Sequence, residues 1–211
     1  MLIISKSIIA AAAASLLFAA PQRVRDVTPA VPALETAVFA GGCFWGIEAV
    51  FEHVKGVTNA ESGYSGGKFD DPSYEDVSSG LTGHAESVRV TFDPTVVTYK
   101  QLLKVFFSVA HDPTQLNYQG PDHGTQYRSA IFFVTPSQKS DADAYIDSLT
   151  KAHTFKKPIV TQVVPFTKFW IAEAYHQNYL EHHPNEPYIV YNDQPKLVAL
   201  KSQLPDLYKG K

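Results

Sequence analysis

Cysteine 43 is the residue of this chain best suited to chemistry. It is the only cysteine among 211 residues and lies in the segment Gly41-Gly42-Cys43-Phe44-Trp45-Gly46. A single thiol cannot form an intrachain disulfide, and it lacks the cysteine partners of the usual zinc sites. Glycines on both sides permit tight backbone conformations and the close approach of a ligand. We therefore expect Cys43 to be a nucleophile, and the alternative is an inert buried thiol.

The residues after Cys43 predict a helix that begins at the thiol. Four apolar residues recur at helical spacing, namely Phe44, Ile47, Phe51 and Val54. The first turn of a helix carries free N–H groups and a partial positive charge, so a cysteine there is expected to be more acidic than usual. Trp45 lies off the apolar stripe and is available to line a binding site, although it could equally pack under a loop.

Glu86 is the second candidate for chemistry. It precedes an alternating segment and shares its parity with Val88, Val90 and Phe92, so its side chain should face the apolar side of a strand. Burial raises the pKa of a carboxyl towards a form that keeps its proton, and such a group can act as a general acid. The alternative is that Glu86 lies at the end of the strand and reaches water.

A long polar segment, residues 111–128, is a further candidate, because long loops on compact domains often carry function. Tyr127 within it, and Tyr74 before it, have hydroxyl groups that could stabilise an oxygen that gains charge. The eight histidines include no pair at the spacing of a metal site with an obvious acidic third ligand. We therefore expect no metal.

Strands and helices alternate along the chain. Apolar or alternating segments predict strands over residues 36–40, 57–64, 86–92, 130–134 and 159–164. Amphipathic segments predict further helices over residues 99–110, 137–152 and 172–180. Prolines and hairpin-like turns at the strand edges favour an α+β fold, with a mixed sheet, a split β-α-β (ferredoxin-like) core and long loops. A doubly wound parallel sheet is the second choice.

Composition and the N-terminus limit the class of protein. The net charge of −3 and the lack of a long basic run argue against nucleic-acid binding. Lys6 precedes an apolar run, residues 8–20, that is shorter than the roughly 20 residues of a membrane span. This predicts a signal peptide over residues 1–20 and a periplasmic location, or else an uncleaved membrane anchor. An extended linker (21–35), a catalytic domain (36–183) and an irregular C-terminal tail (184–211) are predicted to follow.

Several linked motifs of this chain occur together in one known family. The chain resembles the peptide-methionine (S)-S-oxide reductases, which are the A-type methionine sulfoxide reductases. The resemblance extends over residues 37–180. It rests on Gly-Cys-Phe-Trp-Gly at 42–46, Gly-Tyr-Ser-Gly-Gly at 63–67, Gly-His-Ala-Glu at 83–86, His-Asp-Pro-Thr at 111–114, Gln-Tyr-Arg-Ser at 126–129 and Ala-Tyr-His-Gln at 174–177.

The resemblance implies a reaction and the residues that perform it. The Cys43 thiolate would attack the sulfur of methionine sulfoxide, and Glu86 would give a proton to the departing oxygen. Tyr74 and Tyr127 would donate hydrogen bonds to that oxygen. The products would be methionine and a sulfenic acid on Cys43, and the role would be the repair of oxidised proteins and peptides.

Substrate binding and regeneration are implied by the same resemblance. Phe44 and Trp45 would form an apolar pocket for the methyl group of the substrate, and Asp122 would support the site. Many family members carry further cysteines near the C-terminus that resolve the sulfenic acid, but residues 181–211 contain none. An external thiol reductant such as thioredoxin would then be required. No bound cofactor is implied, and we expect a monomer.

Two other classes of function remain compatible with a lone thiol. A cysteine hydrolase would pair Cys43 with a histidine such as His176 and would form an acyl-enzyme. A binding module would hold an apolar ligand between its aromatic residues and would tolerate alkylation of the thiol. A reductase differs from both, because it should convert methionine sulfoxide to methionine in a stoichiometric burst that consumes thiol.

Overall fold

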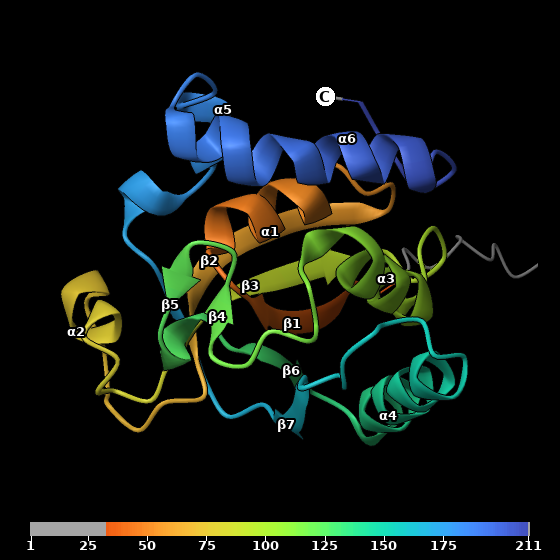
Figure 1. The fold of residues 1–211 in the computed structure, drawn as a ribbon, viewed down its shortest axis with the longest axis horizontal. Helices are drawn as coiled ribbons and strands as arrows, with labels where there is room; N and C mark the ends of the chain where they lie inside the picture. Colours follow the sequence, from red (N-terminus) through yellow and green to blue (C-terminus); the bar gives the residue numbers. More distant parts are fainter. Residues whose placement is uncertain (1–32, 211) are drawn as a thin grey trace, which may run out of the picture. The chain divides into compact units, whose positions relative to one another are not determined.

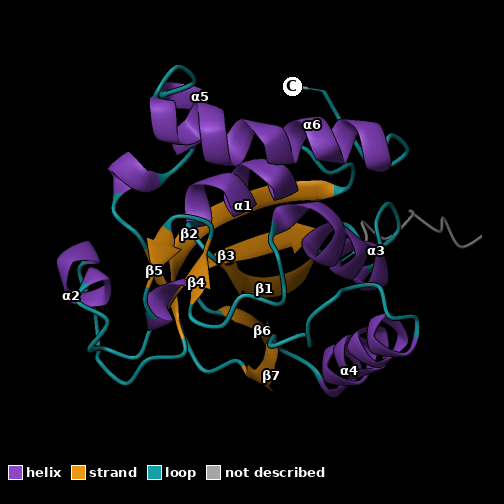
Figure 2. Cartoon of the chain, viewed as in Figure 1, coloured by secondary structure: helices purple, strands orange, loops and turns teal. Residues whose placement is uncertain are grey.

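A six-stranded sheet with the order β7-β6-β1-β3-β2-β8 forms the centre of the computed structural model, which describes residues 33–210 (Figures 1 and 2). β1 (Glu35–Gly41) and β2 (Val57–Ser65) both pair antiparallel with β3 (Ala85–Phe92), which lies between them. β1 and β2 are therefore parallel to each other, and α1 (Phe44–Glu52) connects them. This is the split β-α-β unit that the sequence predicts.

A second unit of the same kind extends the sheet. β6 (Ser129–Phe133) pairs antiparallel with β1, and α3 (Tyr99–Val105) lies in the connection from β3 to β6. After α4 (Pro136–Lys151), β7 (Gln162–Pro165) adds to β6 in parallel, while β8 (Phe169–Ile171) pairs antiparallel with β2. Parallel and antiparallel pairs coexist, so the predicted α+β class with a mixed sheet is confirmed.

Alternate residues of the strands build two cores on opposite faces of the sheet. From β1, Phe39 enters the main core, where its ring stacks on Phe51 of α1 at 5.0 Å, whereas Val38 belongs to a smaller cluster on the other face. Val88 of β3 also enters the main core. Glu86 has the same parity as Val88, so β3 brings this carboxyl to the face that α1 covers.

Two predicted helices differ from the structure. The helix predicted over residues 99–110 begins as α3 but continues as a π-helix over Phe106–Ala110. The single helix predicted over residues 172–180 is wrong. The chain forms a 3₁₀ turn at Ala174–His176 and then the short α5 (Tyr179–His182). The break falls at Asn178, whose φ of 53° is left-handed and incompatible with a continuous right-handed helix.

The C-terminal segment is helical, so the irregular tail predicted over residues 184–211 is wrong. A π-helical turn at Ile189–Asp193 leads into α6 (Gln194–Gln203), which lies alongside α1 in Figure 1. Leu200 is fully buried in the main core. Several prolines in the segment disguised this helical pattern. Pro195 itself fits the first turn of α6, where a backbone N–H is not needed.

The boundaries of the folded domain also differ from the prediction. The domain begins with β1 at Glu35 and continues past residue 183 through α6. The predicted signal peptide over residues 1–20 and nearly all of the predicted linker lie outside the described residues. Within residues 33–210, no helix combines the length and the apolar character needed to cross a membrane.

Candidate active site

Cys43 lies where β1 passes into α1. It is the N-cap residue of α1 and only 7% exposed. A Cβ on Gly41 would lie 2.8 Å from Cγ of His111, and one on Gly42, whose φ is +103°, would lie 2.6 Å from Cβ of Gln119. The two glycines before the thiol therefore let the protein's own long loop, residues 111–128, pack against the end of β1.

Hydrogen bonds fix this loop beside the thiol. The His111 ring bonds through Nδ1 to the Phe106 carbonyl at 3.0 Å and through Nε2 to the Ser129 hydroxyl at 2.7 Å. The side chain of Gln119 accepts a hydrogen bond from the Asp112 amide and donates one to the Asp112 carbonyl, both at 3.1 Å. Because the loop is anchored in this way, it can hold the candidate residues that it carries in a defined place.

Glu86 meets the helix that carries the thiol. The residue is 2% exposed, and its Oε2 accepts a hydrogen bond of 3.1 Å from the backbone N–H of Phe44, the first residue of α1. Burial raises the pKa of Glu86 to about 8, against the opposing effect of the Phe44 N–H. The carboxyl therefore keeps its proton at neutral pH, which is the state that a general acid requires.

The thiol itself differs from the sequence-based expectation of an acidic cysteine. Burial, followed by the charges of Glu86 and Asp193, raises the pKa of Cys43 well above its usual value. The backbone N–H of Trp45 and the Lys196 ammonium act in the opposite direction but are outweighed. Desolvation thus dominates over the position at a helix N-terminus. The resting thiol is protonated and has to lose its proton during a reaction.

The two candidate tyrosines lie in the same cluster. Tyr74 begins α2 (Tyr74–Ser78), and Tyr127 ends the 3₁₀ turn that starts at Thr125. Burial, together with the charge of Glu86, raises the pKa of both tyrosines, and Cys43 adds to this in each case. Their hydroxyl groups are therefore neutral hydrogen-bond donors close to the acid and the thiol.

Phe44 and Trp45 form an aromatic wall together with residues from the segment after β8. The Trp45 ring stacks on Tyr179 at 3.7 Å, and its Nε1–H donates a hydrogen bond of 3.1 Å to Nδ1 of His176. Phe44 packs on the same His176 ring at 4.9 Å. Nδ1 of His176 accepts from tryptophan, and burial lowers the pKa of this histidine. His176 thus supports the wall, which argues against the hydrolase alternative.

Asp122 is held by the C-terminal segment, whose contribution was not predicted from the sequence. The Tyr188 hydroxyl donates a short hydrogen bond to Asp122, and the Tyr188 ring meets Trp45 edge-on at 5.8 Å. Asp193 and Lys196 of the same segment form an ion pair at 3.0 Å. The spacing of apolar residues after position 188 was the available signal, because it indicates a helix rather than an irregular tail.

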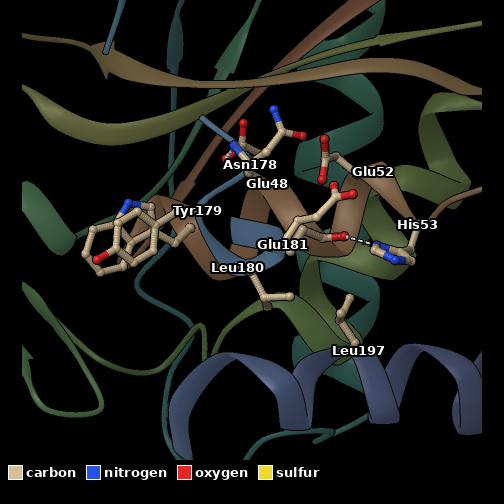
Figure 3. Close-up of a pocket in the computed structure, with 10 residues that line it drawn as sticks. Glu48, Glu52, His53, Asn178, Tyr179, Leu180, Glu181 and Leu197 are labelled. Atoms are coloured by element: carbon tan, nitrogen blue, oxygen red, sulfur yellow. Dashed lines mark hydrogen bonds between the residues drawn. The ribbon is translucent and has the colours of Figure 1, made fainter. Parts of the chain in front are cut away.

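A pocket of about 210 Å³ adjoins the aromatic wall (Figure 3). Trp45 and Tyr179 line it, the carboxylate side chains of Glu52 and Glu181 extend into it from α1 and α5, and Leu197 of α6 forms a further side. Cys43 is not among its lining residues. The pocket is therefore a neighbour of the thiol site, with Trp45 shared between them. Within residues 33–210, no three His, Cys, Asp or Glu side chains are grouped so as to hold a metal ion.

Comparisons with known proteins agree on one family. The family model for peptide methionine sulfoxide reductase matches residues 35–207. The chain is 59% identical over 182 residues to the peptide methionine sulfoxide reductase MsrA 2 of Mesorhizobium japonicum. The aligned residues cover 86% of this chain and 93% of that protein. It is 49% identical over 193 residues to the MsrA 2 of Synechocystis sp., with 90% of each chain covered.

Solved structures agree with the sequence matches. The reduced form of Mxr1 from Saccharomyces cerevisiae superposes with a TM-score of 0.66 at 32% identity, over 72% of this chain and 87% of that one. Methionine sulfoxide reductase A of Corynebacterium diphtheriae gives a TM-score of 0.64 at 36% identity, over 74% and 77% of the two chains. The chain that holds Cys43 and Glu86 in this arrangement therefore belongs to the peptide methionine sulfoxide reductase family, whose A-type enzymes reduce methionine sulfoxide.

Proposed function

We propose that this enzyme reduces the S epimer of methionine sulfoxide, free or in proteins, through a sulfenic acid on Cys43 that an external thiol then reduces. One observation carries the proposal. Cys43 is the N-cap residue of α1, and the protonated carboxyl of Glu86 accepts a hydrogen bond from the next backbone N–H, so a nucleophile and an acid are fixed at one helix end.

The first step transfers oxygen from the substrate to Cys43. Sγ of Cys43 forms a bond to the sulfoxide sulfur, and the oxygen, protonated by Glu86, becomes a hydroxyl group. The bonds from the substrate sulfur to Sγ and to oxygen then break as the hydroxyl bonds to Sγ, which releases methionine and leaves a sulfenic acid on Cys43. The substrate sulfur gains two electrons and Cys43 loses two. Glu86 gives its proton to the oxygen, and the resulting carboxylate is returned to the carboxylic acid by the proton that the thiol gives up. No net proton is consumed.

The polar groups and the aromatic wall have separate tasks in this step. A sulfoxide oxygen leaves poorly unless it is protonated, and Tyr74 and Tyr127 add two neutral donors to the acid. A preorganised donor to an oxygen that gains charge contributes about 3 kcal/mol to the transition state. A pocket for one methyl group, formed by Phe44 and Trp45, contributes about 1–3 kcal/mol. The donors therefore determine the rate, and the aromatic wall determines the choice of epimer.

Regeneration requires a thiol from outside the chain, because Cys43 has no second cysteine to attack it. A thiol of a thioredoxin-like reductant attacks the sulfenic sulfur as its thiolate, a mixed disulfide forms, and the hydroxide leaves as water with the proton that the thiol gave up. A second thiol of the reductant then releases Cys43 and forms the reductant's own disulfide. The chain returns to its starting state without any bound cofactor.

A single-turnover experiment without reductant tests the function. The wild-type protein should form one methionine for each Cys43 thiol lost, and it should consume the S epimer while leaving the R epimer intact. Cys43→Ser should form no methionine. Methionine formed by this variant, or formed by the wild type without loss of thiol, would contradict the proposed mechanism.

We also propose that the protein is exported, on the basis of the short apolar run at residues 8–20 after Lys6. Mass spectrometry of the protein from its native host should then find a mature N-terminus near or after residue 20. Soluble cytosolic protein that retains Met1 would contradict export, and membrane-bound protein that retains it would favour the anchor.

A further inference from the structure

An ion pair from the C-terminal segment covers the first turn of the helix that carries Cys43. Asp193 is fully buried, the Lys196 side chain is 17% exposed, and the Lys196 ammonium donates a hydrogen bond of 3.0 Å to Oδ1 of Asp193. Both groups lie against Gly46. A Cβ there would overlap Oδ1 of Asp193 and would lie 2.7 Å from Nζ of Lys196. Glycine at the third position of α1 thus admits the pair to the turn that begins at Cys43.

Stability alone gives a poor account of this pair. Desolvation of a buried ion pair offsets most of its attraction, and apolar replacements are often as stable. A helix N-terminus favours Asp193 but disfavours the Lys196 ammonium. Oδ2 of Asp193 has no hydrogen-bond partner within the described part of the chain, so the carboxylate is not the centre of a bonding network. The placement of the pair against the first turn of α1 indicates instead that its charges act on Cys43.

The titratable groups around Cys43 show which of them carries a positive charge. They come from several elements: Glu86 from β3, Tyr74 from α2, Tyr127 from the turn after β5 (Asp122–His123), Tyr179 from α5, and Tyr188, Asp193 and Lys196 from the C-terminal segment. His111 and His176, which pack on the residues flanking Cys43, have pKa values lowered by burial and are neutral. Among these described residues, Lys196 is the cation. Its charge favours the Cys43 thiolate and also reaches Asp122.

We propose that Lys196 and Asp193 are positioning residues for the first step of the reaction. Lys196 supplies the positive charge that favours the Cys43 thiolate against the negative charge of Asp193, and Asp193 holds the ammonium over the first turn of α1. The inference deepens the proposed function, since it rests on attack by the Cys43 sulfur. The C-terminal segment of this chain, which has no second cysteine, thus places a cation where it offsets part of the negative charge that opposes the thiolate of the first one.

The lone cysteine makes a direct test possible, because alkylation by iodoacetamide reports on Cys43 alone. Lys196→Met should raise the pH of half-maximal alkylation by about one unit, and Asp193→Asn should lower it by a comparable amount. The double variant should fall between the two single variants. Lys196→Arg, which keeps the charge, should stay near the wild-type value. Lys201→Met, at an exposed position of α6, is the matched control and should leave alkylation unchanged.

Opposite shifts from the two halves of one ion pair would support the proposal, because a loss of packing would change access to the thiol in the same sense for both. Shifts in the same direction, or no shift in either variant, would overturn it. Circular dichroism checks that each variant folds, and Lys196→Gln replaces Lys196→Met under the same criterion if the latter does not fold. Alkylation needs no sulfoxide, so its result is independent of the single-turnover test of function.

Discussion

Two buried glutamates meet at α1, Glu48 as a residue of the helix and Glu86 as a neighbour of its first turn. The contrast between their surroundings separates a catalytic group from a structural one. Glu86 is 2% exposed and Glu48 is 1% exposed. Burial is the main cause of a raised pKa in both, to about 8 for Glu86 and about 7 for Glu48. Exposure and pKa therefore do not distinguish these two carboxyls.

Their partners do distinguish them. Oε2 of Glu48 accepts hydrogen bonds from the Ser62 hydroxyl at 3.0 Å and the Asn178 amide at 3.1 Å, so Glu48 ties α1 to β2 and to the segment before α5. Glu86 accepts a hydrogen bond from the first backbone N–H of α1 and interacts electrostatically with Cys43. A raised pKa thus reports burial, and the reactive group nearby determines what the proton can be used for.

The largest expected difference between the two glutamates is in the rate of the first step. Glu86→Gln should slow formation of the Cys43 sulfenic acid about 10²-fold, because a general acid contributes about 10²–10⁴-fold and an amide can still donate a hydrogen bond. Glu48→Gln, the matched control, should stay within about twofold of the wild type. Single-turnover formation of methionine measures both variants.

The pH dependence of the same rate sharpens this result. Glu86 has to be protonated to act, so the advantage of the wild type over Glu86→Gln should disappear as the pH rises through about 8. Equal rates for the wild type and Glu86→Gln at pH 7 would show that this carboxyl is not the acid. A large loss of rate in Glu48→Gln would show that the two sites are not separable.

The sequence was sufficient for Glu86 because the information is local. Alternation with Val88 and Val90 places its side chain on the core face of β3, and the apolar spacing after Cys43 predicts α1. The partners of Glu48 are 14 and 130 residues away along the chain, and local periodicity does not encode such contacts. The partnership of Asp122 with Tyr188, 66 residues apart, was missed for the same reason.

The acidity of Cys43 was mispredicted for a related physical reason. The favourable effect of a helix N-terminus depends on the adjacent residues and can be inferred from sequence. Desolvation depends on everything that packs around the thiol, including the C-terminal segment with Asp193. A local pattern thus predicted the position of the sulfur correctly but not its protonation state.

A second prediction concerns stability and compares Glu48 with an uncharged side chain. The folded-state pKa of Glu48 is raised from 4.5 to about 7, so its contribution is fully present below pH 4.5 and is lost as the pH rises through about 7. The free energy of unfolding of the wild type, relative to Glu48→Gln, should therefore fall by about 3 kcal/mol over this range. Urea unfolding at a series of pH values measures the difference.

The two glutamates should differ in where this loss ends. Relative to Glu86→Gln, the decline in wild-type stability should continue to about pH 8, since the pKa of Glu86 is the higher of the two. A stability difference that does not depend on pH would mean that the replaced carboxyl has the same pKa in the folded and unfolded chains, contrary to its burial.

The smallest expected effect concerns Asn178, whose backbone N–H donates a hydrogen bond to Glu48. Asn178 donates its N–H to Glu48 from a left-handed conformation with a φ of 53°, which asparagine tolerates better than alanine does. Asn178→Ala should therefore lower the free energy of unfolding by about 1 kcal/mol, whereas Asn178→Gly should change it by a few tenths. Neither variant should alter the single-turnover rate, because the thiol and Glu86 do not depend on this link. If Asn178→Ala were as stable as the wild type but slower in turnover, the link through Glu48 would belong to the active site after all, and the separation of the two glutamates would fail.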